Sequence, residues 1–460
     1  MIPRTVLLTA LFAIALIGPA HAQNATQPAP PAAPAAAPRP ALAPTLAQVN
    51  QTFDEVFARI HDRYVDPTNP THVLADALNG MLTKLDPHSY YLTPAQWKDQ
   101  QAQNTGVFGG LGMQIELESG VVSVVAPLDG TPAARAGIKP ADIVRSADGH
   151  DFKGETLQQV LERLRGAPGS TIRLTIARPG EAKPFDVTLK REIIHVQVVK
   201  SRLIDDIGYI RMTSFSDQSD PNLRSALSAF HAKLGDKLSA LILDLRNNPG
   251  GLFGGATAVA NDFLSGGEIV ALRGRTPQDN HVWTASPGRE VAGKLPLVVM
   301  INSGTASAAE IVSGALQDQH RAVLIGTRSF GKGSVQLLFP LDNGGAIRLT
   351  TARYYTPSGR SIQAEGIVPD VRVEQSRTPL LSNGPAREAD LAGALKNPGS
   401  IASSATAPPR SDLPPIAAQI PKLPPKDWPK YDPTKPATDF QLAQAIVLAK
   451  AMAAQAGTGK

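Results

Sequence analysis

One stretch of the chain combines residues that could perform acyl transfer. Residues 301–316 read INSGTASAAEIVSGAL and follow an apolar run that is typical of a buried strand. Apolar residues at helical spacing then predict a helix that begins just after Ser307. The amide of Ala308 and the positive end of that helix could stabilise an oxyanion beside the Ser307 hydroxyl. The alternative is that these small polar residues serve only as helix N-caps.

A second stretch could supply another oxyanion donor. Residues 244–251 read DLRNNPGG and follow the apolar stretch ALIL, which predicts a buried strand. Without a Cβ, Gly250 and Gly251 allow backbone N–H groups to approach a ligand closely. One amide from this pair and the amide of Ala308 could form a two-donor oxyanion hole. An ordinary turn between a strand and a helix is the simpler interpretation of the same letters.

A serine nucleophile needs a base, and three residues are candidates. His281 and His320 are the nearest histidines in sequence, and neither has an evident carboxylate partner. Lys332 could serve if burial lowered its pKa from about 10.4 to roughly 7–8. Gln336 could then accept a hydrogen bond from the amine and orient it. A bend would have to bring Lys332 and Gln336 together, and Gly333 could provide it.

The stretch around Lys332 also resembles a phosphate-binding loop. Residues 326–333 read GTRSFGKG, one residue short of the nucleotide-binding pattern, because Gly333 stands where Ser or Thr should hold magnesium. The following letters, GSVQLLFPL, are β-branched and apolar and do not begin a helix. A nucleotide site is therefore disfavoured, and no metal or other cofactor is expected.

Residues 105–192 have a composition of their own. Alternating strands and two short helices predict a small, partly open β-barrel. The loop formed by Gly110, Leu111, Gly112 and Met113 exposes successive N–H groups that could hold a terminal carboxylate while the peptide adds as an edge strand. The apolar face of the helix ETLQQVLERL would line the side-chain pocket. A hairpin loop without a ligand is the alternative.

The remaining elements indicate how these groups are positioned. Residues 203–375 alternate strands and helices, which predicts a layered α/β core within a domain of residues 193–375. Residues 45–104 show helical periodicity. Residues 376–460 are rich in Pro, Ser and Ala before a final helix at 439–456, and we interpret them as a linker and a helical arm.

The N-terminus predicts export. An early Arg4, an apolar run of about 12 residues and the letters AHA indicate a signal peptide, residues 1–22, cleaved after Ala22. A retained membrane anchor is the alternative. Residues 23–44 form a Pro/Ala-rich linker. The chain has no Cys, which excludes a thiol nucleophile, and its net charge of +5 argues against nucleic acid as a partner. A periplasmic enzyme is expected.

Taken together, these stretches resemble the C-terminal processing peptidases, or tail-specific serine proteases. The matching letters are LDPHSYYL (85–92), GGLGM (109–113), DLRNNPGG, INSGTASAAEIVSGALQD (301–318), GTRSFGKGSVQ (326–336), YYTPSGRSIQ (354–363) and GIVPD (366–370), in the family's order. The resemblance implies a core similar to crotonase and Clp protease, and a PDZ domain at 105–192. It implies Ser307 as nucleophile, Lys332 as base, Gln336 as its orienting residue, and oxyanion donors from Ala308 and the Gly250–Gly251 turn.

The resemblance also predicts partners. We expect a periplasmic serine endopeptidase that binds free apolar C-termini of proteins through Gly110–Met113 and cleaves near them. An adaptor lipoprotein and self-association into a homo-oligomer are further expectations. The rival interpretation is a non-catalytic PDZ scaffold, which is disfavoured because both Ser307 and Lys332 are present. Processing of one precursor and general degradation of proteins both remain open.

Overall fold

The computed structural model describes residues 44–118, 120–128, 130–195, 197–377, 387–399 and 410–458. The predicted signal peptide, and the predicted linker up to residue 43, lie outside these residues. The chain divides into two units, Met1–Thr68 and Asn69–Lys460. In the first unit the structure describes helix α1 (Leu46–Arg63), which begins at a capping box formed by Thr45 and Gln48. Among the described residues, no helix is long and apolar enough to cross a membrane.

The second unit begins with two helices and a short strand. Helix α2 (Pro70–Leu82) starts after the Asn69 cap, and α3 (Pro94–Thr105) starts at the capping box of Thr93 and Gln96. Strand β1 (Tyr90–Leu92) lies between them and pairs with a strand of the core, β18 (Ala346–Tyr355). The LDPHSYYL stretch is thereby held against the core.

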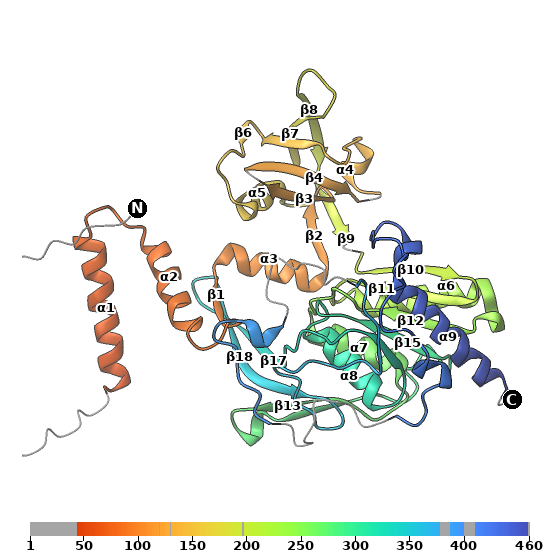
Figure 1. Cartoon of the computed structure of the whole chain (residues 1–460). Coiled ribbons are helices and arrows are strands. Elements are labelled where there is room, and N and C mark those ends of the chain that lie inside the picture. Colours follow the sequence, from red (N-terminus) through yellow and green to blue (C-terminus); the bar gives the residue numbers. More distant parts are fainter. Residues whose placement is uncertain are drawn as a thin grey trace, which may run out of the picture. The chain divides into compact units, whose positions relative to one another are not determined.

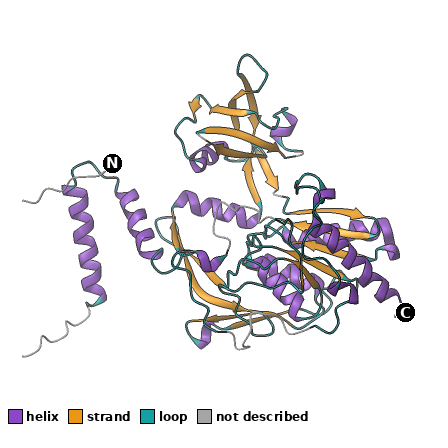
Figure 2. Cartoon of the chain, in the orientation of Figure 1, coloured by secondary structure: helices purple, strands orange, loops and turns teal. Residues whose placement is uncertain are grey.

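A small β-rich domain follows. Its sheet has the order β3 (Met113–Glu118), β4 (Val121–Pro127), β5 (Ile143–Ala147), β7 (Thr171–Ala177) and β8 (Phe185–Lys190), with β6 (His150–Asp151) pairing β5. Helices α4 (Pro132–Arg135) and α5 (Leu157–Leu164) complete it, as Figure 2 shows. Alternate residues of β7 face a separate apolar cluster, so this domain has a core of its own. A ribbon of β2 (Val107–Gly110) and β9 (Glu192–His195) stands at its two chain ends.

The core is built on a six-stranded sheet. Its order is β10 (Val199–Ile204), β11 (Ile207–Met212), β12 (Ala240–Asp244), β15 (Leu297–Ile301), β16 (Val323–Gly326) and β19 (Val371–Arg372). Strand β10 runs antiparallel to β11, and the other neighbours are parallel. Every residue of β12 and β15 is buried, as expected for parallel strands that are covered on both faces.

Helices cover both faces of this sheet. Helices α6 (Ser219–Leu234), α7 (Phe253–Phe263) and α8 (Ala308–Asp318) pack on one face around a large apolar cluster. Helix α9 (Phe440–Thr458) packs on the opposite face, over β12 and β15 (Figure 1). The C-terminal segment that precedes α9 contains short 3₁₀ turns at Glu388–Asp390, Pro415–Ala418 and Pro436–Thr438.

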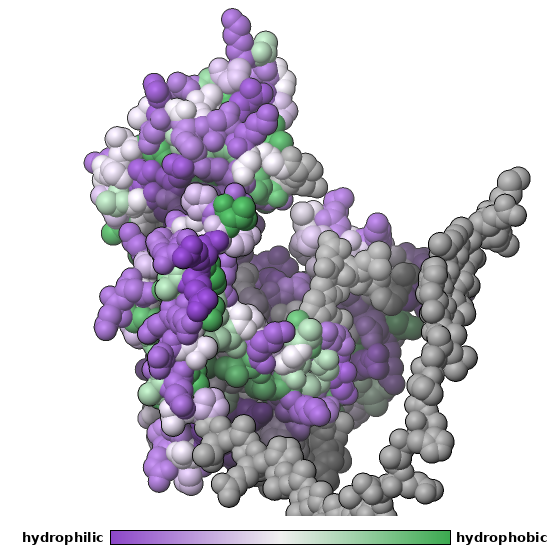
Figure 3. Space-filling view, turned by 90° about the vertical axis from the view of Figure 1, so that its left-hand side faces the viewer, coloured by the Kyte–Doolittle hydropathy of each residue, from purple (hydrophilic) through white to green (hydrophobic). Residues whose placement is uncertain are grey.

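A second sheet lies against α7 and α8. It contains β1, β18, β13 (Glu268–Gly274) and β14 (His281–Thr284), and β17 (Ser334–Pro340) pairs with β18. Val270, Leu272 and Tyr354 of this sheet belong to the same apolar cluster as α7 and α8. The resulting layers confirm the predicted fold class, a layered α/β core with a β-rich domain. On the face seen in Figure 3, hydrophilic side chains predominate and hydrophobic ones form separate patches.

Candidate active site

Ser307 occupies the tight turn between β15 and α8. Its backbone has φ 55° and ψ −117°, a conformation that a residue with a Cβ adopts only when its surroundings enforce it. The enforcing contacts come from the neighbouring turn: the Thr305 hydroxyl donates to the Leu245 carbonyl at 2.8 Å, and the Ala306 amide donates to the Asn248 carbonyl at 2.9 Å. Ser307 is half-buried and stands at the N-terminus of α8, as predicted.

The DLRNNPGG turn lies directly beside Ser307. A Cβ placed on Gly250 would meet the Ser307 Cβ and the Ala308 nitrogen at 2.9 Å each. The Gly250 amide is already used, because it donates to Asn248 Oδ1 at 2.9 Å. In the described part of the chain, no acceptor is found for the amides of Gly251 and Ala308. Of the predicted oxyanion donors, the amides of Gly251 and Ala308 are therefore the available ones. Gly250 is needed because a side chain there would collide with Ser307.

A buried carboxylate ties the two halves of the site together. Glu310 Oε2 accepts the backbone amides of Ser307 and Lys332 at 2.7 and 2.9 Å. Its Oε1 accepts the Ser329 hydroxyl at 2.5 Å and the Gly331 amide at 2.7 Å. Glu310 has no exposed surface, and burial raises its pKa to about 7 although all four hydrogen bonds oppose this.

Glu310 is not among the site residues predicted from the sequence. The signal available was the spacing S-x-x-E at a helix start, because a Glu three residues after an N-cap commonly reaches back to the cap amide. Only half of this interaction is local here. The remaining hydrogen bonds of Glu310, to the loop before β17, join two segments that are distant in sequence, and no sequence pattern indicates them.

Lys332 has the lowered pKa that a base requires. Burial, followed by the positive charge of Arg348, lowers the pKa of its amine to about 8, while the carboxylates of Glu388, Glu310 and Asp86 act in the opposite direction. The Tyr354 hydroxyl donates to the Lys332 carbonyl and also interacts with the Ser307 side chain. Tyr354 thus gives a second link between the predicted nucleophile and the predicted base.

Gln336 lies in β17, four residues after Lys332 and just after a β-bulge. Its Nε2 donates to Ser334 Oγ at 3.0 Å and to Thr350 Oγ1 at 3.1 Å, which leaves its carbonyl oxygen as the acceptor. The pairing of β17 with β18 shifts register between Val335 and Gln336, so a β-bulge is present in addition to Gly333. In the described residues, no hydrogen bond joins the Lys332 amine to the Ser307 hydroxyl or to Gln336. The closeness that the structure does show is between the backbones of Ser307 and Lys332, which share the Glu310 oxygen.

The LDPHSYYL stretch contributes a further network beside the lysine. Both oxygens of the buried Glu388 lie 2.9 Å from His88 Nε2. Gln363 Nε2 donates to the same Glu388, and Gln363 Oε1 accepts the amide of Gly333 at 2.9 Å. This chain of contacts runs from His88 to the residue next to Lys332. The sequence predicts no role for His88, Gln363 or Glu388, because they come from three distant segments.

The two histidines considered as bases lie elsewhere. His320 follows the C-terminal end of α8, whereas Ser307 precedes its N-terminus, and an 11-residue helix separates them by about 16 Å. His320 is half-exposed and lies 3.6 Å from Asp412. His281 is an exposed residue of β14 that packs on Trp283. Of the three candidates, Lys332 is the one whose backbone amide shares an acceptor oxygen with that of Ser307.

The glycine-rich loop of the β-rich domain forms one wall of a narrow groove. Gly110, Leu111, Gly112 and Met113 line a cavity of about 50 Å³ together with Leu161 and Leu164 of α5. Strand β3, which follows the loop, is the edge strand of its sheet. Gly112 has φ 73°, and a Cβ there would lie 2.2 Å from Thr131. Arg165, which also lines the groove, forms an ion pair with Asp99 of α3.

Comparisons with known proteins show which protein family the chain resembles. A model of peptidase family S41 matches residues 206–373, and a PDZ domain model matches residues 123–178. The carboxy-terminal-processing protease of Bartonella bacilliformis is 46% identical over 324 residues, which is 70% of this chain and 74% of that protein. A probable CtpA-like serine protease of Staphylococcus aureus is 33% identical over 322 residues, covering 70% and 64% of the two chains. Among solved structures, the photosystem II D1 C-terminal processing protease is 27% identical with a TM-score of 0.42, covering 70% and 92%.

Proposed function

We propose that this chain, which belongs to the carboxy-terminal-processing serine proteases of peptidase family S41, cleaves peptide bonds with Ser307 as nucleophile and Lys332 as general base. The observation that carries the assignment is the shared Glu310 oxygen, which holds the backbones of both residues side by side. The lowered pKa of Lys332 supports it, because an amine with a pKa of about 8 is partly uncharged near neutral pH.

The reaction proceeds through an acyl-enzyme. The uncharged Lys332 amine takes the proton of the Ser307 hydroxyl as the oxygen attacks the substrate carbonyl. The amides of Gly251 and Ala308 receive the negative charge that develops on the carbonyl oxygen. The protonated amine then gives its proton to the leaving nitrogen, and the C–N bond breaks. Water, deprotonated by the same amine, releases the acyl group. Gln336 orients the amine through its free carbonyl oxygen.

The groove of the PDZ domain selects substrates in this proposal. The amides of the Gly110–Met113 loop bind the terminal carboxylate, the peptide adds to the edge strand β3, and Leu161 and Leu164 contact its last side chain. The supporting observations are the open edge of β3 and the convergence of loop and helix on one narrow groove. The substrates are accordingly proteins with free apolar C-termini.

Export and self-association complete the proposal. We place the mature protein in the periplasm because residues 1–22 have the pattern of a signal peptide. Self-association is supported by α1, whose side chains Leu46, Val49, Phe53 and Val56 expose between 37% and 77% of their surface. Exposed apolar side chains on one helix are commonly covered by a partner.

A cleavage assay tests the catalytic assignment. Ser307→Ala and Lys332→Ala should each reduce cleavage of an unfolded substrate with a free apolar C-terminus by at least about 100-fold, as expected for loss of a nucleophile or base. Circular dichroism and thermal unfolding should show that both variants remain folded. Mass spectrometry of the products locates the cut. Undiminished turnover in the Lys332→Ala protein would remove the base assignment, and equal cleavage of a C-terminally amidated substrate would remove the role of the PDZ groove.

A further inference from the structure

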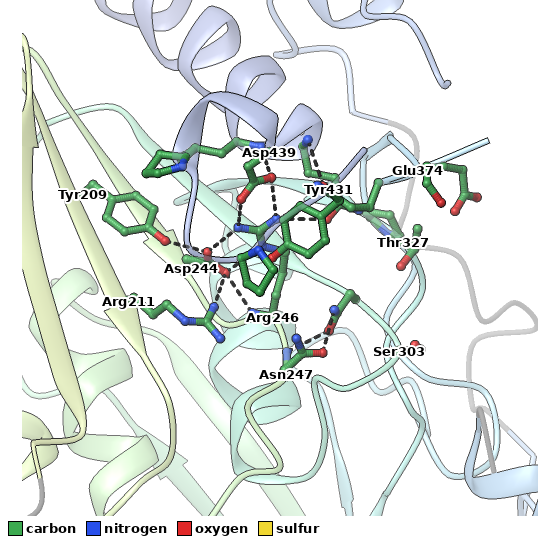
Figure 4. A pocket seen from close by; sticks show the side chains of 18 of the residues that line it. Tyr209, Arg211, Asp244, Arg246, Asn247, Ser303, Thr327, Glu374, Tyr431 and Asp439 are labelled. Carbon is green, nitrogen blue, oxygen red and sulfur yellow. Dashed lines mark hydrogen bonds and ion pairs between the residues drawn. The ribbon is translucent and has the colours of Figure 1, made fainter. Parts of the chain in front are cut away.

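A large cavity lies on the side of the central sheet that faces away from α8. It has a volume of about 1100 Å³ and is lined by residues at the carboxyl ends of β11, β12 and β15 and by the C-terminal segment 431–442. Figure 4 shows Tyr209, Arg211, Asp244, Arg246 and Asp439 around it. Neither Ser307 nor Lys332 lines this cavity. Its lining does include Asn247, Asn302 and Arg328, from the turns that lead to Gly250, Ser307 and Lys332, so the cavity borders the candidate active site without containing its nucleophile or base.

The lining of this cavity is basic. It contains eight Lys or Arg residues and four Asp or Glu residues. Each of the four acidic residues already forms an ion pair within the lining: Asp244 and Asp439 with Arg246, Glu374 with Arg372, and Asp432 with Lys435. Lys200 and Arg202 have no carboxylate partner among the described residues, and both are exposed. The cavity thus has positive charge left over for a ligand.

The chain itself shows that a polypeptide carboxylate fits this surface. Asp439, which comes from the C-terminal arm, makes two hydrogen bonds to the guanidinium of Arg246, at 2.9 and 2.7 Å. The same guanidinium holds Asp244, whose pKa is lowered to about 2 by Arg246 and Arg211 although burial acts to raise it. Paired N–H···O bonds of this kind are the strong form of carboxylate recognition.

The spacing of the unpaired cations indicates the form of the ligand. Lys200 and Arg202 are alternate residues of β10, the edge strand of the sheet, and they stand opposite Arg211 and Tyr209. Alternate residues of a strand point to the same face and lie about 6.6–6.8 Å apart. The Arg202 guanidinium also stacks on the Tyr209 ring at 4.7 Å, which restrains its position. Carboxylates at alternate positions of an extended peptide have the same spacing.

We propose that this cavity binds an extended acidic peptide segment, with carboxylates at alternate positions contacting Lys200 and Arg202. Its volume exceeds what a single small anion would fill. Its lining also includes Tyr431 and three prolines, Pro369, Pro433 and Pro436, which offer apolar contact to a peptide backbone. Because recognition depends on interior carboxylates, the segment need not include a chain terminus.

Binding can be measured without catalysis. The full chain carrying Ser307→Ala is titrated with a fluorescent peptide that alternates Glu and Thr and is acetylated and amidated at its ends. Blocked ends remove the terminal carboxylate that the PDZ groove would hold. We expect saturable binding that weakens as salt is raised. The isosteric Gln–Thr peptide and a peptide with its Glu residues in one block should bind at least about fivefold more weakly.

Matched variants locate the site. Lys200→Ala and Arg202→Ala should each weaken binding of the alternating peptide about fivefold or more. Lys190 is an exposed basic residue on a strand of the β-rich domain, and Lys190→Ala should leave this binding unchanged. The proposal would be overturned if all variants bound the alternating peptide equally, or if the peptide with its Glu residues in one block bound as tightly as the alternating one. Lys200 and Arg202 would then serve only to prevent another strand from pairing with the edge of the sheet. Binding of inorganic phosphate more tightly than the peptide would overturn it in favour of a small-anion site. Because only binding by the Ser307→Ala chain is measured, these outcomes are independent of the proposed catalytic roles.

Discussion

Ser307 and Lys332 donate their backbone N–H groups to the same oxygen of Glu310. Ser307 immediately precedes α8 and Lys332 precedes β17, so a single buried carboxylate fixes the distance between two elements that meet only in the tertiary structure. The Tyr354 hydroxyl adds a second link between them. The geometry of the proposed nucleophile and base therefore depends on Glu310, which does not itself need to contact a substrate.

Glu310→Gln should reduce kcat much more than it changes KM. The side-chain amide of the variant keeps one acceptor oxygen. Its NH₂ group, however, would face N–H or O–H donors that the second carboxylate oxygen of Glu310 accepts in the native protein. We expect kcat to fall at least about tenfold and the free energy of unfolding to fall by about 1–3 kcal/mol, the cost of leaving buried donors unpaired. Steady-state kinetics and thermal unfolding measure both. Glu365→Gln, at a surface ion pair, is the control. An unchanged kcat would contradict the positioning role.

The pH dependence of kcat/KM should report the ionisation of Lys332. Its pKa is lowered to about 8, and only the uncharged amine accepts a proton, so kcat/KM should rise with pH and level off above about pH 8. Arg348 lowers this pKa and Glu388 raises it. Arg348→Gln should therefore move the acid limb to higher pH, and Glu388→Gln should move it to lower pH. Identical profiles for both variants would show that Lys332 is not the titrating group.

Gly250→Ala should remove activity while the matched Gly254→Ala preserves it. At Gly250, φ is 97°, and a Cβ would meet the Ala306 carbonyl oxygen at 2.8 Å and the Ser307 Cβ at 2.9 Å. At Gly254, in α7, a Cβ would meet nothing within 4 Å. We expect a loss of about 100-fold or more in kcat for the first variant, comparable to removing an oxyanion donor. For the second we expect near-normal kinetics and a gain in stability of up to about 1 kcal/mol. Full activity of the Gly250→Ala variant would show that the reaction does not take place beside the Gly250 turn.

Leu161→Asp should impair recognition of C-termini rather than catalysis. The side chain lines the groove beside the Gly110–Met113 loop, and a carboxylate there would repel the terminal carboxylate of a bound peptide. We expect KM for a substrate with a free apolar C-terminus to rise about tenfold or more, with little change for its amidated form. Glu162→Gln, on the exposed side of the same helix, is the control. If both substrates respond equally to Leu161→Asp, the groove does not read the terminus.

Much of the fold could be predicted because its signals are local. The fully buried strands β12 and β15 appear in the sequence as the apolar runs ALIL and LVVM, and α8 and α9 lie within a few residues of their predicted positions. Turn glycines and strand ends also marked the positions of Ser307 and Gly250–Gly251. The resemblance to the processing peptidases then connected these stretches, and the comparisons confirm that family.

What could not be predicted are contacts between distant segments. The Glu310 carboxylate, the His88–Glu388–Gln363 network and the basic cavity each join residues from separate stretches, and none has a spacing of its own in the chain. The choice among the amides of the DLRNNPGG turn also required the structure, because only the fold shows that Asn248 already accepts the amide of Gly250.

The amino-acid sequence by itself determined which elements form and which residue types stand at their ends, because helix caps, buried strands and glycine turns depend on neighbours in the chain. The tertiary structure alone decided that the backbone of Lys332, rather than that of a candidate histidine, shares the Glu310 oxygen with Ser307, and that the Lys332 amine has a pKa of about 8. Burial and through-space charge set both properties, and each depends on which distant groups the packing of α8, β17 and β18 brings together.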